Sequence, residues 1–227
     1  RIDERGLGAC RTRSMRNLLV DGPRSLGQRS RRRRWDQFRQ RFPDIESMSV
    51  LDLGGTVEYW LRAPVRPRHV HLLNLGDEPA EPPPSWIRWD VADATDVPES
   101  LLAGPYDLVY SNSVIEHVGG HAARARFAAN VAALAPRHWI QTPYRYFPVE
   151  PHWVAPMMQY LPLALRARMG LHWPLVHTPH ADLASAVDAQ LQVELLDITA
   201  MRHYFPDSTM VYDRFVGLVK SVIAVRS

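Results

Sequence analysis

The chain has 227 residues, 46% of them hydrophobic, and a formal net charge of +3 at pH 7. This length and composition predict one domain with a single core. No apolar run reaches the roughly 18 residues that span a bilayer, and the arginine-rich start lacks the apolar segment of a secretory signal. A lone cysteine, Cys10, excludes an internal disulfide. We therefore expect a cytoplasmic protein without a membrane span.

Positive charge is concentrated at the start of the chain. Residues 1–41 hold 13 arginines against four acidic residues, a balance of +9, whereas the remaining 186 residues carry −6. Residues 1–28 show no apolar period and are expected to form a flexible basic tail. From Ser30 onward, Trp35, Phe38 and Phe42 recur at helical spacing and predict a helix that covers the sheet edge. Nucleic-acid binding by the arginines is the less favoured alternative.

Residues 50–56, Val-Leu-Asp-Leu-Gly-Gly-Thr, predict a buried strand that ends in a glycine turn. Gly54 and Gly55 lack a Cβ, so the backbone can turn tightly and a bulky ligand can approach it. Asp52 would lie at the carboxyl end of this strand, where open α/β sheets bind their ligands. Because many proteins contain a strand followed by a plain Gly-Gly turn, this motif alone leaves the function open.

Three later segments repeat this plan of an apolar strand with a polar end. Residues 69–75 end at Asn74, residues 86–93 at Asp93, and residues 106–112 at Ser111 and Asn112. The ends lie 22, 19 and 19 positions apart, which is the pitch of βα units in one parallel sheet. After the glycine turn only residues 57–62 can be helical, and the prolines of 78–84 exclude a helix before the third strand.

The second half of the chain predicts fewer regular elements. A helix is expected at 121–135, a fifth strand at 138–142, and two final strands at 191–197 and at about 214–225. Residues 143–190 are too long for a simple crossover and are expected to form a substrate lid. As an alternative, the apolar residues within it pack as an ordinary helix: Met157, Met158, Leu161, Leu163 and Leu165.

The four ordered strand ends between residues 48 and 142 resemble the core of a class I methyltransferase that uses S-adenosylmethionine. Residues 110–118, Tyr-Ser-Asn-Ser-Val-Ile-Glu-His-Val, are similar to the segment after the fourth strand of methyltransferase type 11-like proteins, including actinobacterial sugar O-methyltransferases. The resemblance implies an α/β, Rossmann-like seven-stranded sheet of order 3-2-1-4-5-7-6, helices on both faces, and a lid between strands five and six. Residues 29–227 would form this domain, and S-adenosylhomocysteine would be the product.

The resemblance also implies a role for each strand end. It assigns the amino-acid end of the cofactor to Asp52, Gly54 and Gly55, the ribose to Asn74, the adenine to Asp93 and Ala94, and the transferred methyl to Ser111 and Asn112. Thr56 and Glu58 stand where the family often has glycines, so the Thr56 hydroxyl is expected to help hold the amino-acid end. Asn74 replaces an acidic residue and offers one acceptor and one donor group. The chain lacks the glycine motifs of dehydrogenases and nucleoside triphosphatases.

Two pairs of glutamate and histidine could remove a proton from an acceptor hydroxyl: Glu116-His117 after the fourth strand, and Glu150-x-His152 after the fifth. Alternation in an extended loop puts Glu150 and His152 on the same side. His152 is the favoured base, with Glu150 orienting it, and His117 is the second choice. For each histidine the alternative is a purely structural role. A metal-assisted version that uses Glu150 and His152 is a further alternative, but two ligands without a third are weak evidence, so no metal site is predicted.

The aromatic residues of 143–190 suit a sugar or an aromatic acceptor, and Tyr144, Tyr146 and Trp153 are the expected substrate-binding residues. The predicted function is methyl transfer to a hydroxyl of a small molecule, with a sugar or oligosaccharide as the favoured acceptor. An RNA or protein methyltransferase that uses the basic tail is the alternative. The chain lacks the Asn/Asp-Pro-Pro-Tyr motif of many amino-directed nucleic-acid enzymes. A non-catalytic cofactor-binding module is the third, least favoured reading. The oligomeric state is not predicted.

Overall fold

The computed structural model describes residues 26–76, 79, 81–102, 104–175 and 179–227. The expected flexible tail therefore lies almost wholly outside the described residues. Its last three positions belong to the first described helix, α2 (Leu26–Arg41). No helix in the described part of the chain is long and apolar enough to cross a membrane.

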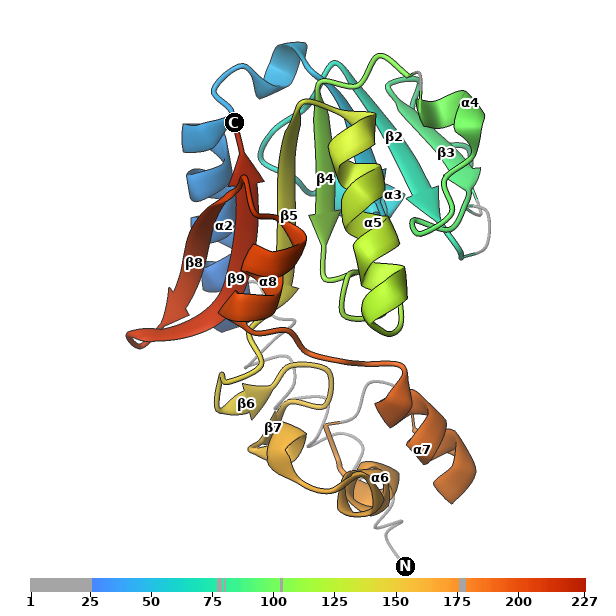
Figure 1. The fold of residues 1–227 in the computed structure, drawn as a ribbon, viewed down its shortest axis with the longest axis vertical. Helices are drawn as coiled ribbons and strands as arrows, with labels where there is room; N and C mark the ends of the chain where they lie inside the picture. Colours follow the sequence, from blue (N-terminus) through green and yellow to red (C-terminus); the bar gives the residue numbers. More distant parts are fainter. Residues whose placement is uncertain (1–25, 77–78, 80, 103, 176–178) are drawn as a thin grey trace, which may run out of the picture.

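A seven-stranded sheet of order β3-β2-β1-β4-β5-β9-β8 forms the centre of the molecule (Figure 1). The first five strands are parallel, β9 is antiparallel to β5, and β8 is antiparallel to β9. This topology is the one predicted, with β9 and β8 as the closing hairpin. The strands are β1 (Ser49–Leu53), β2 (His69–Asn74), β3 (Ile87–Val91), β4 (Leu108–Asn112), β5 (Arg137–Pro143), β8 (Thr209–Phe215) and β9 (Leu218–Arg226).

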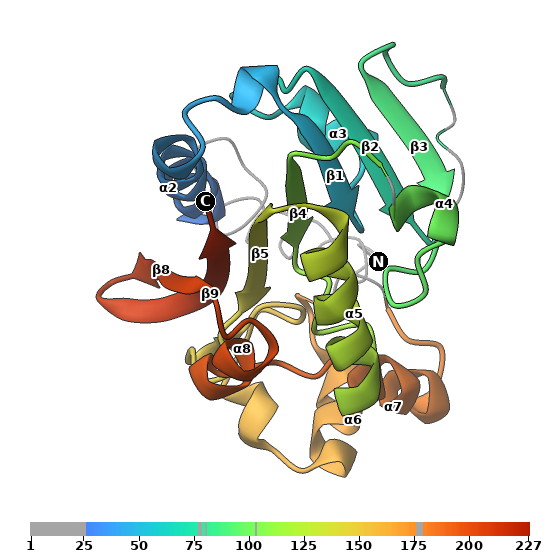
Figure 2. The same ribbon diagram turned by 45° about the horizontal axis from the view of Figure 1, so that its top comes forward.

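Helices cover both faces of the sheet, as predicted. On one face α5 (His121–Leu134) and α8 (Ile198–Tyr204) pack against a core that includes Leu51 and Ile140, while α4 (Glu99–Leu102) lies beside α5 (Figures 1 and 2). On the other face, a second core joins α2 and α3 (Val57–Leu61) to Val50 and Leu108. Alternate residues of β1 thus serve opposite faces, because strand side chains alternate. A short 3₁₀ turn, η2 (Ile45–Ser47), links α2 to β1.

The predicted aromatic stripe anchors α2. Trp35, Phe38 and Phe42 are buried against the sheet, and the ring of Trp35 stacks on Tyr110 of β4 with centroids 6.0 Å apart. Burying an aromatic side chain of this size contributes roughly 1.5–3 kcal/mol. This packing brings the arginine-rich helix next to the carboxyl end of β4.

The strand expected at 191–197 is wrong. Helix α7 (Leu183–Leu191) ends there, Leu196 makes only an isolated bridge with Tyr144, and α8 begins at Ile198. The Asp197 side chain accepts a hydrogen bond from the Ala200 amide at 2.8 Å and caps α8, which ends any extended run. In the predicted order the sixth strand pairs with the seventh, and that place beside β9 is taken by β8.

The described residues of the segment 143–190, apart from Pro143 at the end of β5, lie beyond the carboxyl ends of β4 and β5 (Figures 1 and 2). They form the short strands β6 (Val149–Glu150) and β7 (Ala155–Pro156), the 3₁₀ turn η3 (Met158–Tyr160), and α6 (Leu163–His172), which packs on α7. A continuous helix over the apolar residues 157–165 is not formed. Leu161 is extended because it precedes Pro162, and α6 begins only after that proline.

Candidate active site

The turn after β1 requires both of its glycines. Gly54 has φ +83°, and its amide donates to the Leu73 carbonyl at 2.7 Å. A Cβ on Gly55 would lie 1.9 Å from Oδ2 of Asp52, which leaves no room for any other residue. The space beside each glycine is filled by another side chain, Val114 at Gly54 and Asp52 at Gly55, so the turn packs closely only because neither residue has a Cβ.

Asp52 is a buried carboxyl group with one satisfied oxygen. Its Oδ2 accepts a hydrogen bond from the Trp60 indole at 2.7 Å, and its Oδ1 has no partner among the described residues. Burial raises the pKa of Asp52 to about 7. The turn thus contains a buried acceptor that a donor group of a ligand would satisfy.

Thr56 and Asn74 bind neighbouring backbone. The Thr56 hydroxyl accepts from the Tyr59 amide at 3.3 Å and caps α3. The Asn74 amide nitrogen donates to the Gly55 carbonyl at 2.9 Å, while its oxygen accepts from the Gly76 amide at 3.0 Å. A carboxylate at position 74 could not donate to Gly55, so asparagine braces the glycine turn in a way that an acidic residue cannot.

The ends of β3 and β4 complete the group of side chains at this edge. Asp93 is exposed, and its Oδ1 accepts from the Thr95 amide at 2.7 Å. The buried Ser111 hydroxyl donates to the Leu53 carbonyl at 2.9 Å, and Asn112 accepts from Arg34 at 3.0 Å. We call the following residues the strand-end group: Asp52, Gly54, Gly55, Thr56, Asn74, Asp93, Ala94, Ser111 and Asn112.

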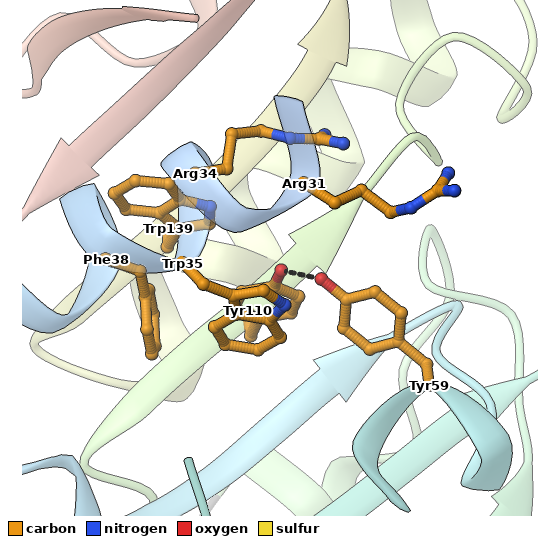
Figure 3. Close-up of a pocket in the computed structure, with 7 residues that line it drawn as sticks. All are labelled: Arg31, Arg34, Trp35, Phe38, Tyr59, Tyr110 and Trp139. Carbon is orange, nitrogen blue, oxygen red and sulfur yellow. Dashed lines mark hydrogen bonds between the residues drawn. The ribbon is translucent and has the colours of Figure 1, made fainter. Parts of the chain in front are cut away.

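A small pocket lies where α2 crosses β4, and the sequence did not single it out (Figure 3). The hydroxyls of Tyr59 and Tyr110 are hydrogen-bonded to each other, and burial raises the pKa of Tyr59 to about 12. Arg31 and Arg34 extend from the helix that also supplies the aromatic stripe. Arg31 and Arg34 lie seven and four positions before Phe38, so helical spacing puts them on the same side of α2 as the aromatic stripe. This spacing could have distinguished them from the exposed arginines of the helix. The pocket is lined by Arg31, Arg34, Trp35, Phe38, Tyr59, Tyr110 and Trp139.

The second polar group, which we call the Glu–His cluster, consists of Glu116, His117, Glu150 and His152. The structure brings both predicted pairs together. Nδ1 of His152 lies 2.7 Å from Oε1 of Glu150, and Nε2 of His152 lies 3.1 Å from Nε2 of His117. The cluster joins the loop after β4 to the loop after β5.

Backbone and side-chain contacts hold the two carboxyl groups of the Glu–His cluster in place. Oε2 of Glu150 accepts from the Trp153 amide at 2.8 Å, and Oε2 of Glu116 accepts from the Thr142 hydroxyl at 2.9 Å. Oε1 of Glu116 is buried and has no partner among the described residues. The Glu150 carboxyl group therefore orients His152, and the Glu116 carboxyl group has one oxygen without a hydrogen-bond partner among the described residues.

Burial and charge change the proton affinities within the Glu–His cluster. Burial raises the pKa of Glu116 to about 7. Burial lowers the pKa of His117, and the neighbouring His152 adds to this effect. Burial also disfavours the charged form of His152, but the Glu150 carboxylate outweighs it, so the pKa of His152 is raised. The environment thus separates the two histidines, with His152 the more basic.

The expected substrate-binding residues fall into two environments. Trp153 is buried with Ala155 and Met158, so its ring belongs to the core of the 143–190 segment. Tyr144 and Tyr146 are in contact with ring centroids 5.6 Å apart, and Tyr146 stacks on Tyr160 at 6.4 Å. Tyr146 and Tyr160 are 52% and 45% exposed, so these two rings supply aromatic surface that a ligand can reach.

The methyltransferase domain family matches residues 28–195 of the chain. No curated protein matches the sequence. Among solved structures, the fold is similar to an S-adenosylmethionine-dependent methyltransferase from Mesorhizobium loti, with 16% identity, coverage of 85% of this chain and 97% of that one, and a TM-score of 0.51.

It is also similar to the methyltransferase domain of bacterial CtHen1, with 10% identity, coverage of 86% and 98%, and a TM-score of 0.52. A Rhodobacter sphaeroides protein assigned provisionally to the zinc-dependent alcohol dehydrogenases has 11% identity, coverage of 85% and 87%, and a TM-score of 0.52. Likeness at these identities shows the fold alone.

Proposed function

Because the chain belongs to the methyltransferase domain family and is an S-adenosylmethionine-dependent methyltransferase, we propose that its acceptor is a hydroxyl group of a small molecule, specifically of a carbohydrate. The observation that carries this proposal is the contact between Glu150 and His152 beyond the carboxyl ends of β4 and β5. A hydroxyl acceptor must lose a proton during methyl transfer, and an imidazole oriented by a carboxylate is suited to accept it.

The strand-end group fits the cofactor. The turn after β1 depends on its two glycines, and the buried Oδ1 of Asp52 lacks a donor among the described residues. Bound S-adenosylmethionine supplies a methyl group on a positively charged sulfur. In the proposal Asp52, Gly54 and Gly55 hold its amino-acid end with the help of the Thr56 turn. Asn74 serves the ribose side, Asp93 and Ala94 the adenine, and Ser111 with Asn112 the methyl.

His152 is the proposed proton acceptor. Glu150 accepts a hydrogen bond from Nδ1–H of the neutral ring, which leaves the Nε2 lone pair to take a proton. A proton gained at Nε2 creates a positive charge that the Glu150 carboxylate stabilises. The Trp153 amide fixes the other oxygen of Glu150, so the ring is held in one orientation. His117, next to Nε2, is the second candidate for this role.

The exposed tyrosines support the choice of a carbohydrate. Tyr146 and Tyr160 stack with an interplanar angle of 13°, and Tyr144 meets Tyr146 edge to face. Tyrosine combines a flat apolar face with a hydroxyl that forms hydrogen bonds, which matches the mixed surface of a sugar ring. These rings lie in the same segment as Glu150 and His152.

An RNA acceptor is the second candidate, because Arg29, Arg32 and Arg33 are exposed on α2. Contacts from such arginines to phosphates would make binding salt-dependent. The Glu–His cluster favours a hydroxyl acceptor in either case, and the acceptor assay below separates the two classes.

The test is release of S-adenosylhomocysteine with mono- and oligosaccharides, the matching deoxy sugars, an amino sugar and total RNA. We expect turnover with one or more hydroxyl sugars and none with the sugar that lacks the methylated hydroxyl. Tyr146→Ala should raise the KM for the sugar, whereas Tyr212→Ala on β8 should not. Turnover with RNA, protein or amines alone would overturn the proposed acceptor.

A further inference from the structure

We propose that Glu116, His117 and His152 bind one divalent transition-metal ion, and that this ion holds the acceptor hydroxyl. Each residue offers one ligand atom, and these atoms all lie within 4.8 Å of one another. The role of the ion in methyl transfer rests on the proposed function, whereas binding of the ion does not.

The two histidines already meet as ligands would. Nε2 of His152 and Nε2 of His117 face each other at 3.1 Å, with the rings nearly perpendicular. With its Nδ1 proton donated to Glu150, neutral His152 directs the Nε2 lone pair toward His117. A cation between the two nitrogens would use this lone pair.

Glu116 provides the second, independent observation. Its side chain is 1% exposed, Oε2 is taken by Thr142, and Oε1 has no partner among the described residues. A buried carboxylate oxygen without a partner is costly, and a bound cation would remove this cost. Charge and geometry thus both point to the space bounded by Glu116 and the two histidines.

The surroundings of the histidines match those of metal ligands. Such a histidine usually donates a hydrogen bond from its second ring N–H to a carboxylate or a backbone carbonyl, which fixes the orientation of the ring. Glu150 plays this part for His152, and the backbone carbonyl of Gln192 is hydrogen-bonded to His117. Glu150 is therefore a positioning residue in the metal-bound protein.

The ligand set selects the class of ion. Two imidazoles with one carboxylate suit Zn²⁺, Mn²⁺, Co²⁺ or Fe²⁺, whereas Mg²⁺ and Ca²⁺ prefer oxygen ligands. Three protein ligands leave coordination positions open, as catalytic sites do. The acceptor hydroxyl would occupy an open position, where the ion would ease loss of its proton.

The ion changes the part played by His152 but not the balance of the reaction. The acceptor O–H bond breaks and its proton passes to water. An oxygen lone pair then forms the new O–C bond, while the C–S bond breaks and sulfur keeps the electron pair as S-adenosylhomocysteine. In the metal-bound protein Nε2 of His152 is a ligand, and the ion replaces the free imidazole as the means of removing the proton.

The first experiment measures binding of Zn²⁺ and of Mn²⁺ to the chelator-treated full chain by calorimetry. We expect one ion per chain. His117→Ala and Glu116→Gln should each weaken binding by more than the roughly 10–100-fold expected for Glu150→Gln, which removes only an outer partner. His121→Ala is the matched control, because the rings of His121 and His203 form another histidine pair, 5.7 Å apart. Binding that is unchanged in His117→Ala, or equally weakened in the control, would overturn the site.

The second experiment measures methyl transfer to the sugar hydroxyl before and after chelation. We expect activity to be lost with the chelator and restored by one of the four ions, while S-adenosylhomocysteine affinity is unchanged. Transfer that survives complete removal of metal and still depends on His152 would overturn the role of the ion and leave the proposed function intact. If an ion binds but no hydroxyl is methylated, the metal site is supported and the proposed acceptor is rejected.

Discussion

The strand-end group and the Glu–His cluster are built in different ways. In the strand-end group, Thr56, Asn74 and Asp93 bond to backbone two or three positions along the chain. In the Glu–His cluster, Glu116 bonds to a residue 26 positions away and the two histidines are 35 positions apart. The first group thus combines local turns with contacts between neighbouring strands, such as that from Ser111 to Leu53, whereas the second depends on how the 143–190 segment packs against the sheet.

This difference suggests that cofactor binding and methyl transfer depend on separate parts of the molecule. In our proposal the strand-end group binds the cofactor, and none of its residues belongs to the 143–190 segment. The Glu–His cluster exists only when the loops after β4 and β5 meet. Changes in the first group should alter cofactor affinity, and changes in the second should alter the rate of transfer.

The largest effect is expected for His152→Ala. Loss of the group that removes the proton, directly or through a bound ion, should lower the single-turnover rate by roughly 10²–10⁴-fold. Calorimetry should show S-adenosylhomocysteine affinity within about twofold of the parent, because His152 has no place in the strand-end group. A parent-like rate would show that His152 has a structural role, and the Glu–His cluster would then not control the transfer step.

A substitution of His138, which lies on β5, tests how the stability of the sheet that carries both groups depends on pH. Burial lowers the pKa of this imidazole to about 4, from an ordinary value of 6.5. Since the folded state favours the neutral ring, this stabilisation is complete above pH 6.5 and is lost as the pH falls through 4. Between pH 7 and pH 4 the parent should lose about 3 kcal/mol more unfolding free energy than His138→Gln. Urea unfolding with equal pH dependence in both proteins would contradict this.

Gly55→Ala tests the strand-end group alone. The added Cβ would overlap the Asp52 carboxyl at 1.9 Å. Displacing this buried group should destabilise the fold by about 1–3 kcal/mol and should weaken S-adenosylhomocysteine binding measured by calorimetry. Gly120→Ala is the control, because a Cβ there meets nothing within 4 Å. Parent-like affinity for Gly55→Ala would place the cofactor elsewhere.

The smallest effect is expected for Asp93→Ala, which removes an exposed hydrogen-bond acceptor. Affinity for S-adenosylhomocysteine should fall by about 1 kcal/mol, or roughly fivefold. The single-turnover rate at saturating cofactor should stay the same, and Asp96→Ala should change neither quantity. A slower transfer step with unchanged affinity would show that the two groups are not separable.

The amino-acid sequence by itself determined the sheet and its ligand-binding edge. The first, second and fourth strands each contain a short apolar run, and the first four have polar residues at or just beyond their ends. The carboxyl ends of parallel strands meet at one edge of a sheet, and the resemblance to class I methyltransferases implied the order of the strands. The helical spacing of Trp35, Phe38 and Phe42 similarly predicted α2. These are local patterns, and the structure confirms them.

Only the tertiary structure decided the remaining features. Residues 191–197 were predicted to form a strand, but β8 takes the place beside β9 and Asp197 caps a helix instead. Asn74 read as a weaker ribose ligand, yet its amide braces the glycine turn. Two separate Glu-His pairs became one cluster with three converging ligand atoms. Such outcomes depend on contacts between residues far apart in the chain, whose distances no local pattern contains.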